Sequence, residues 1–267
     1  MFPLHTTALP SSASELERLL NASLQRIFVA QSAPATVSDH SYPHLAAITI
    51  SLDGARLRAD PTRPSVSSDK MAPALEVDQL VFSASPLSLG PASIDLALSA
   101  RDVQLGQAKD SNGQVLLSLK NARDGHAAIS ATPASLEALI TGLAQDQGNK
   151  QGIAIDQVQL KLRQESEDSL VAEVRLRARK LFLSASVKVI GKLELDDQLN
   201  LKISGLNCTG DGGIATLACG ILKPYLEKIE GRKFPLMSLA LGEIRLRDVR
   251  LNVGDKLSVT AEFGSAT

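Results

Sequence analysis

The chain has 267 residues, of which 44% are hydrophobic and 21% charged, a composition typical of a folded globular protein and not of a disordered one. Its formal net charge is −1, it has no tryptophan, and aromatic residues make up 3% of it, so it lacks the basic field and the stacking side chains of nucleic-acid binders. It contains no run of 18 or more apolar residues, which argues against a transmembrane helix.

The N-terminal part predicts a flexible arm, a helix and the first strands. Residues 1–11 show no periodic pattern and are interpreted as the arm. From Ser12 onward apolar residues recur every three or four positions as far as about residue 30, and Ser12 with Glu15 matches a capping box. Alternation from Leu45 indicates a strand, and residues 60–73, with three prolines, predict a loop.

The middle of the chain predicts several strands and a second helix. Strand patterns cover residues 75–84, 93–100, 103–107 and 115–120, and Thr132-Pro133 is typical of a helix start. Apolar and polar residues then alternate from 158 to 178 and again from 181 to 203. The alternation changes parity near Lys180, which predicts a bulge or a bend there.

The C-terminal part predicts a third helix over residues 214–229, kinked or split at Pro224, and strands over 244–253 and 257–263. A rhythm of helix followed by strands occurs three times, but we find no residue-level repeat behind it. Short turns between strands favour antiparallel pairing. The predicted fold class is α+β, with a long curved antiparallel sheet wrapped around one or more amphipathic helices in a single domain over residues 12–267.

No catalytic signature is found, so we predict a protein that is not an enzyme and has no cofactor and no metal. His40 and His44 could hold a surface metal ion, but a solvated pair is the favoured interpretation. The glycines before the third helix do not complete a dinucleotide fingerprint, because Ala215 stands where the last glycine belongs. An anion at that helix start stays open, as does the choice between a disulfide and two free thiols for Cys208 and Cys219.

Two features of the sequence could account for a function. The first is the apolar face of the late strands opposite the third helix, which predicts a groove for an acyl chain, although a plain core is the alternative for any one residue. The predicted lining is Val187, Val189, Leu193, Leu195, Leu199, Leu201, Ile203, Leu217, Ile221, Leu222, Leu226 and Ile229. The second is a basic segment that could contact an anionic bilayer or simply keep the sheet hydrated. It consists of Arg175, Arg177, Arg179, Lys180, Lys188 and Lys192.

About two thirds of the chain, residues 75–263, resembles the LmeA-like phospholipid-binding family of tubular lipid-binding (TULIP-like) proteins. The resemblance rests on residues 99–105 (SARDVQL) as its central strand and on the strand-to-helix step of residues 128–132 and 136–139. Residues 191–195 with 199–201 resemble its late hairpin, which is followed by the helix and the closing strands. The resemblance implies a sheet curved around a long helix with lipid in the seam, and a role as a lipid carrier.

We therefore expect non-enzymatic binding or transfer of a lipid or another hydrophobic ligand, with a membrane surface as a further partner and no nucleic acid. The alternatives are a structural or protein-interaction module with a solid core and, less favoured, a lipid or glycan hydrolase. The expected location is cytoplasmic or peripheral to a membrane, with an envelope location after removal of a leader as the alternative. The oligomeric state is not predicted.

Overall fold

The computed structural model describes residues 2–30, 33–58, 71–150, 152–180, 183–196, 200–235 and 246–265. The chain divides into two compact units, which we describe separately. Unit 1 comprises Met1–Ile129, Ser238–Asp248 and Thr260–Thr267, and unit 2 comprises Ser130–Met237 and Val249–Val259. Whether the two units act as the single domain expected over residues 12–267 stays a prediction, and most of the loop expected at 60–73 lies outside the described residues.

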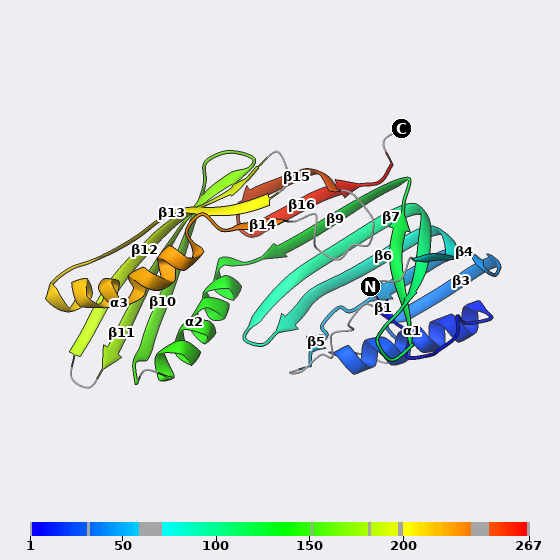
Figure 1. Cartoon of the computed structure of the whole chain (residues 1–267), viewed down its shortest axis with the longest axis horizontal. Helices are drawn as coiled ribbons and strands as arrows, with labels where there is room; N and C mark the ends of the chain where they lie inside the picture. Colours follow the sequence, from blue (N-terminus) through cyan, green and yellow to red (C-terminus); the bar gives the residue numbers. More distant parts are fainter. Residues whose placement is uncertain are drawn as a thin grey trace. The chain divides into compact units, whose positions relative to one another are not determined.

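Unit 1 is built on a mixed sheet in which β15, β16, β9, β7, β6, β4 and β3 are neighbours in that order (Figure 1). The shorter strands pair beside this path. The elements that lie wholly or partly in unit 1 are, in chain order, β1 (Phe2–Pro3), α1 (Ala13–Ile27), β2 (Phe28–Val29), β3 (Ala35–Ser41), β4 (His44–Ser51), β5 (Arg56–Leu57), β6 (Ala72–Leu89), β7 (Ala92–Lys109), β8 (Val115–Asn121), β9 (Asp124–Ala131), β15 (Leu246–Val253) and β16 (Leu257–Phe263).

Most strand pairs are antiparallel, as the short turns predict, but β4 and β6 run parallel. The segment between them is long enough to carry the chain back to the same end of the sheet, which a parallel pair requires. The fold is thus α+β, and its large sheet is mostly antiparallel. Its wrapping around a helix in the TULIP manner stays a prediction.

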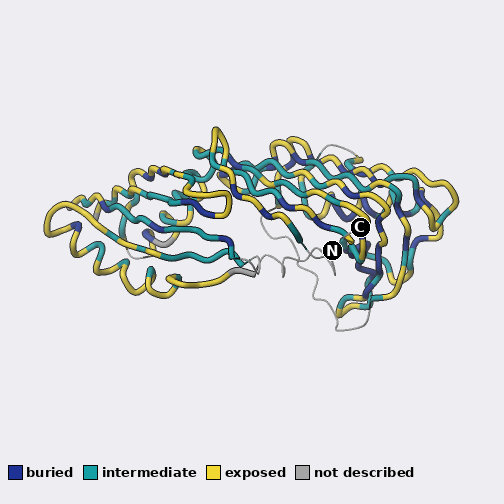
Figure 2. The backbone as a smooth tube through the Cα atoms, turned by 90° about the horizontal axis from the view of Figure 1, so that it is seen from above, coloured by how far each residue is buried: buried dark blue, intermediate teal, exposed yellow. Residues whose placement is uncertain are grey.

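A hydrophobic core cluster lies in unit 1, and Figure 2 shows buried stretches along its strands. Leu16, Leu20 and Leu24 place one apolar stripe of α1 against this core. The N-terminal residues, expected to be a flexible arm, also contribute: β1 pairs with β8, and Leu4 is buried. The difference arises because burial of Leu4 and the backbone hydrogen bonds to β8 outweigh the entropy of a free terminus.

The first two helices begin with side-chain caps at the predicted residues, although the capping box of α1 is incomplete. The Ser12 hydroxyl accepts from the Glu15 amide at 3.2 Å, but the Glu15 carboxylate accepts from Ser11 and not from Ser12, so the capping box is only half formed. Thr132 caps the second helix in the same way. The third helix continues through Pro224 as one element, so the expected split does not occur.

Unit 2 is a five-stranded antiparallel sheet in the order β10, β11, β12, β13, β14, with two helices packed on it. The elements are α2 (Pro133–Asn149), β10 (Ala154–Gln164), β11 (Ser169–Lys180), β12 (Leu183–Leu195), β13 (Asn200–Gly210), α3 (Gly213–Ile229) and β14 (Lys233–Pro235).

The parity change near Lys180 marks the end of a strand and not a bulge. β11 ends at Lys180 and β12 begins at Leu183, where the two residues are paired across an antiparallel hairpin. The end of one strand and the start of the next shift the alternation just as a bulge does, so the sequence pattern alone does not separate them. The irregularity lies instead in β13, where the pairing with β12 shifts and Gly205 has φ +63°.

Candidate functional site

A cavity of about 200 Å³ opens on the apolar face of the unit 1 sheet. Strands β4, β6, β7 and β8 form its floor, α1 contributes Leu20, and β1 contributes Phe2. Among the described residues, none that lines it is charged. The lining consists of Phe2, Leu20, Ile48, Ile50, Leu80, Phe82, Leu96, Leu98, Leu105, Leu117, Ser118 and Leu119.

The strand register explains why these side chains meet. Ile50 is paired with Phe82, and Phe82 with Leu98, so the three side chains stand in one row across β4, β6 and β7. Leu20 and Leu117 are buried, whereas Leu80, Phe82, Leu96 and Leu98 are half-buried. The cavity therefore has a closed apolar back and an accessible apolar mouth.

The one polar lining residue, Ser118, does not make the cavity polar. It alternates with Leu117 and Leu119 along β8, and this alternation directs its hydroxyl to the opposite face of the sheet. That hydroxyl is buried and has no hydrogen-bond partner among the described residues. The cavity can thus hold hydrocarbon, but it offers no charged group to fix an ionic ligand.

The lining predicted in the C-terminal part lies in unit 2, on one face of its sheet. Leu160, Val174, Val189 and Cys208 are paired in sequence across four strands and share that face. Of the predicted residues, Val187, Val189, Leu193, Leu195, Leu201 and Ile203 occupy the same face through their register, while Leu199 lies outside the described residues.

The helical part of the predicted lining is divided between two sides of α3. Leu222, Leu226 and Ile229 are half-buried, whereas Leu217 and Ile221 are 71% and 53% exposed. Of the predicted lining, Leu226 borders a space of about 370 Å³ beside β13. Whether this set lines a lipid site stays a prediction.

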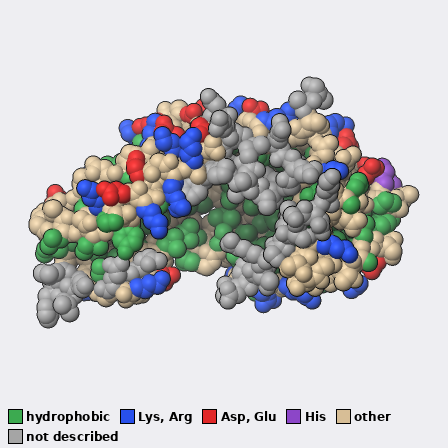
Figure 3. Space-filling view, viewed as in Figure 1, with side chains coloured by type: hydrophobic (Ala, Val, Ile, Leu, Met, Phe, Trp, Pro, Cys, Tyr) green, Lys and Arg blue, Asp and Glu red, His purple; other side chains and the backbone are tan. Residues whose placement is uncertain are grey.

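Unit 2 exposes apolar side chains on both of its helices. Figure 3 shows hydrophobic side chains gathered in the region where α2 and α3 lie. Of the eight large hydrophobic residues exposed in the described part of the chain, six belong to these helices: Leu139, Leu143, Ile214, Leu217, Ile221 and Tyr225. We call these six residues the helix flank. Large apolar side chains exposed on these two helices make them a candidate contact surface.

By register, the predicted basic residues other than Lys180 lie on the opposite, polar face of the unit 2 sheet. Arg175 is paired with Lys188 across the sheet, and Arg177 and Arg179 alternate with apolar residues that face the helices. Lys192 follows the same parity on β12. The side chain of Lys180, at the end of β11, lies outside the described part.

Acidic residues from neighbouring positions neutralise part of this basic face. Glu173 pairs with Arg175 at 2.8 Å, and Lys192 lies 2.8 Å from Glu194 and 3.2 Å from Glu165. Hydrogen bonds first to Glu194 and then to Glu165 raise the pKa of the Lys192 amine. The sequence has no acidic residue between Arg175 and Lys192, but Glu173 and Glu194 flank this segment on the same strands. The contacts of Glu165 with Lys192 and of Asp156 with Arg179, at 3.4 Å, come from outside these two strands and depend on the fold.

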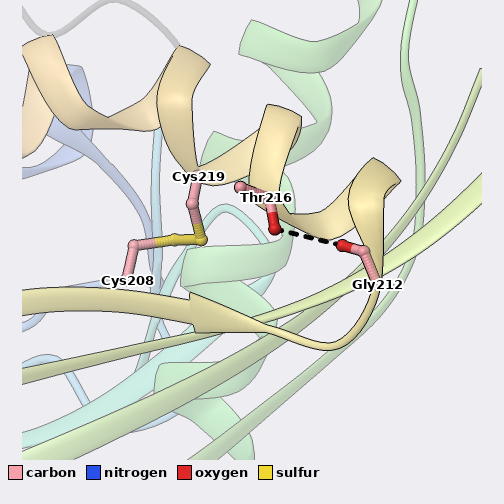
Figure 4. The surroundings of a disulfide bond; sticks show 4 residues. All are labelled: Cys208, Gly212, Thr216 and Cys219. Atoms are coloured by element: carbon pink, nitrogen blue, oxygen red, sulfur yellow. Dashed lines mark hydrogen bonds between the residues drawn. A yellow bond between two sulfur atoms is a disulfide. The ribbon is translucent and has the colours of Figure 1, made fainter.

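The two cysteines form a disulfide that joins β13 to α3 (Figure 4). It fixes α3 over the apolar face that carries Cys208. The glycine-rich segment before α3 forms the strand-to-helix connection, and Gly212 is the N-cap, with φ +86° and no side-chain cap. Thr216 donates its hydroxyl to the Gly212 carbonyl instead.

His40 and His44 converge on one carboxylate. Their Nε2 atoms lie 3.0 and 2.8 Å from the two oxygens of Asp78, all three side chains being exposed. In the described part of the chain, no group of three or more such side chains has a geometry suited to a metal ion. None of the described helices is long and apolar enough to cross a bilayer.

Comparison of the chain with protein-family models, with curated proteins and with solved structures finds no match. The unit 1 cavity was not predicted from the sequence, because its walls come from six elements spread over residues 2–119. The sequence signal for this cavity was the alternation in residues 45–52, 75–84 and 93–100. This alternation predicts that each strand has an apolar face, but it does not predict which of these faces lie together.

Proposed function

We propose that this protein binds a lipid-like ligand without covalent chemistry, with the hydrocarbon chain in the apolar cavity of unit 1. The observation that carries the proposal is that cavity, with its uncharged wall and its half-buried apolar mouth. A site that offers apolar contact and no charge favours an acyl or prenyl chain over a polar metabolite. Carriage of lipid between membranes, as the family resemblance implies, would use the same cavity.

Native mass spectrometry of gently purified full-length protein, followed by organic extraction, tests the proposal. We expect bound acyl or prenyl lipid, and uptake of a fluorescent fatty acid by delipidated protein. Leu98→Trp, at the half-buried mouth, should fill the cavity and lower the affinity for the fatty acid by about tenfold or more.

A matched variant separates this cavity from the lining predicted in unit 2. Ile221→Gln changes an exposed residue of α3, so it should leave fatty-acid binding unchanged if the chain lies in unit 1. A loss of binding in Ile221→Gln but not in Leu98→Trp would move the site to the predicted lining. Absence of lipid and of fatty-acid uptake would refute the function itself.

The contact with an anionic membrane through Arg175, Arg177 and Arg179 is also a proposal. Liposome flotation with and without anionic lipid tests it, and reversing the three charges should abolish the anionic-lipid dependence. Flotation that is insensitive to the reversal would rule this surface out.

A second candidate function is an interaction module, which the helix flank favours. Replacing Leu217 and Ile221 by Glu would then abolish complex formation or self-association, measured by analytical ultracentrifugation, while fatty-acid uptake stays intact.

A further inference from the structure

A short motif occurs twice in strands of unit 1 that are far apart in sequence. Residues 101–105 of β7 read RDVQL, and residues 247–251 of β15 read RDVRL. Both aspartates have the left-handed conformation, with φ +45° at Asp102 and +46° at Asp248. The two segments thus share both their sequence and the backbone conformation of their aspartate.

The left-handed aspartate decides where the preceding arginine points. In a regular strand, residues two apart share a face, so Arg101 would lie beside Val103. Val103 is fully buried, whereas Arg101 is exposed, because the turn at Asp102 changes the parity of the strand. In β15, Asp248 has the same conformation between the half-buried Arg247 and the buried Val249, and Asp is among the few residues that adopt it at low cost.

The two arginines meet at one polar cavity of about 410 Å³. Arg101 is paired with Gln79, which alternates in β6 with Leu80 of the apolar cavity, so this cavity lies on the face of the sheet opposite the apolar one. Its lining is Gln79, Ser99, Ala100, Arg101, Asp124, Gly125, His126, Arg247 and Glu262.

The side chain of Arg247 provides the main indication of a ligand site. Its Nε is buried and has no hydrogen-bond partner among the described residues. Arg101 likewise forms no ion pair with a described residue, and the nearby Arg123 is the one that pairs with Asp102, at 2.6 Å, and with Asp124. A buried guanidinium donor without an acceptor is costly, which a bound anion would relieve.

We propose that Arg101 and Arg247 form a binding site for a phosphate ester. Two planar guanidinium groups supplied by two strands suit the several oxygens of one phosphate group better than a single lysine would. Ser99, Gln79 and His126 offer further polar contacts at the wall. Glu262 and Asp124 would repel a bare dianion, but they would accept hydrogen bonds from an ester that carries an amine or a hydroxyl.

Phosphoethanolamine and glycerol phosphate are therefore the probes. Both occur as free esters and as lipid head groups, and the site would recognise the chemistry that the two sources share. Because the polar cavity lies on the other face of the sheet, its existence does not depend on the proposed lipid function of the apolar cavity.

Isothermal titration of the full chain with the two esters tests the proposal. Arg101→Gln and Arg247→Gln should each weaken binding by about tenfold or more. The matched control is Arg250→Gln, which removes an exposed arginine of the same strand that does not line the cavity, and it should leave the affinity unchanged. Ethanolamine and glycerol without phosphate should not bind.

Vesicles separate the two sources. If the free esters do not bind but flotation with vesicles containing phosphatidylethanolamine depends on Arg101 and Arg247, the ligand is a head group. Binding of neither form, or an equal loss in Arg250→Gln, would overturn the proposal. Should Arg247→Gln fail to fold by circular dichroism, Arg247→Lys keeps the charge without the planar fork and should still weaken binding.

Discussion

At the scale of single residues, the Asn21 side chain hydrogen-bonds the backbone of the edge strand β3, as a neighbouring strand would. Its amide nitrogen donates to the Ala35 carbonyl and its amide oxygen accepts from the Ala35 backbone N–H, both at 2.8 Å. One turn earlier in α1, the Glu17 carboxylate accepts from the Val37 N–H at 2.8 Å. These side chains satisfy backbone groups of β3 that would otherwise be open to pairing with another chain.

Replacing Asn21 by Asp keeps the shape and the acceptor but removes the donor to the buried Ala35. We expect Asn21→Asp to lower the free energy of unfolding by about 1–3 kcal/mol, measured by urea denaturation. Asn112→Asp, in an exposed turn where the side chain makes no such pair, is the control. Equal stability of the two variants would show that the amide pair contributes nothing.

Asp78, with its two histidines, makes stability depend on pH. The hydrogen bond to Asp78 raises the pKa of His44 above its usual 6.5, and hydrogen bonds from His44 and then His40 lower the pKa of Asp78 below its usual 3.8. The His44 contribution is complete below pH 6.5 and is lost as pH rises through the folded-state pKa of His44. The Asp78 contribution is present above pH 3.8 and is lost as pH falls through the folded-state pKa of Asp78.

Both contributions are therefore complete between pH 3.8 and 6.5. Asp78→Asn should lower the melting temperature most at about pH 5, and the difference from the unchanged protein should shrink as pH rises through the folded-state pKa of His44, because the neutral His44 ring forms no ion pair. Asp255→Asn, in the exposed turn between β15 and β16, should show no such profile. A difference that is constant with pH would mean that the contact does not titrate.

At the scale of elements, local pattern predicted most of the secondary structure. The stripe of Leu16, Leu20 and Leu24 and the Thr132-Pro133 start are local signals, and the helices form where these signals occur. The expected strands over 93–100 and 103–107 are one strand, β7, because the left-handed Asp102 changes its parity without ending it. A break in alternation has three causes here, namely a turn, a bulge and a single left-handed residue, and sequence does not distinguish them.

The disulfide joins two elements, α3 and β13, through cysteines that are 11 residues apart in sequence. Closing a loop of that length stabilises the folded state by about 3 kcal/mol in the chain-entropy account. Cys208→Ser with Cys219→Ser, or reduction of the unchanged protein, should therefore lower the free energy of unfolding by this amount in urea. If reductant has no effect on the unchanged protein, the thiols are free in solution.

At the scale of the whole molecule, sequence reasoning identified apolar strand faces but not their partners. Leu98 and Phe82 are neighbours through a hairpin that alternation suggests, but the approach of Leu20, Phe2 and Leu117 depends on non-local pairing. In the same way, Arg101 and Arg247 meet only because β15 and β16 join the sheet beside β9 and β7. Such pairings depend on the apolar surface that the whole sheet buries, and the sequence of a single segment does not determine that surface.

The two cavities proposed as sites lie on opposite faces of one sheet, and this predicts that their ligands bind independently. Strand alternation separates Leu98 from Arg101 by the thickness of the sheet, and no side chain lines both cavities. Coupling between sites requires an element whose equilibrium both ligands shift, and a sheet with a packed core is a poor candidate for one. We expect the affinity for phosphoethanolamine, measured by titration calorimetry, to change by less than about twofold when the apolar cavity is saturated with fatty acid. A change of tenfold or more, present in the unchanged protein and absent in Leu98→Trp, would show instead that filling one face rearranges the other.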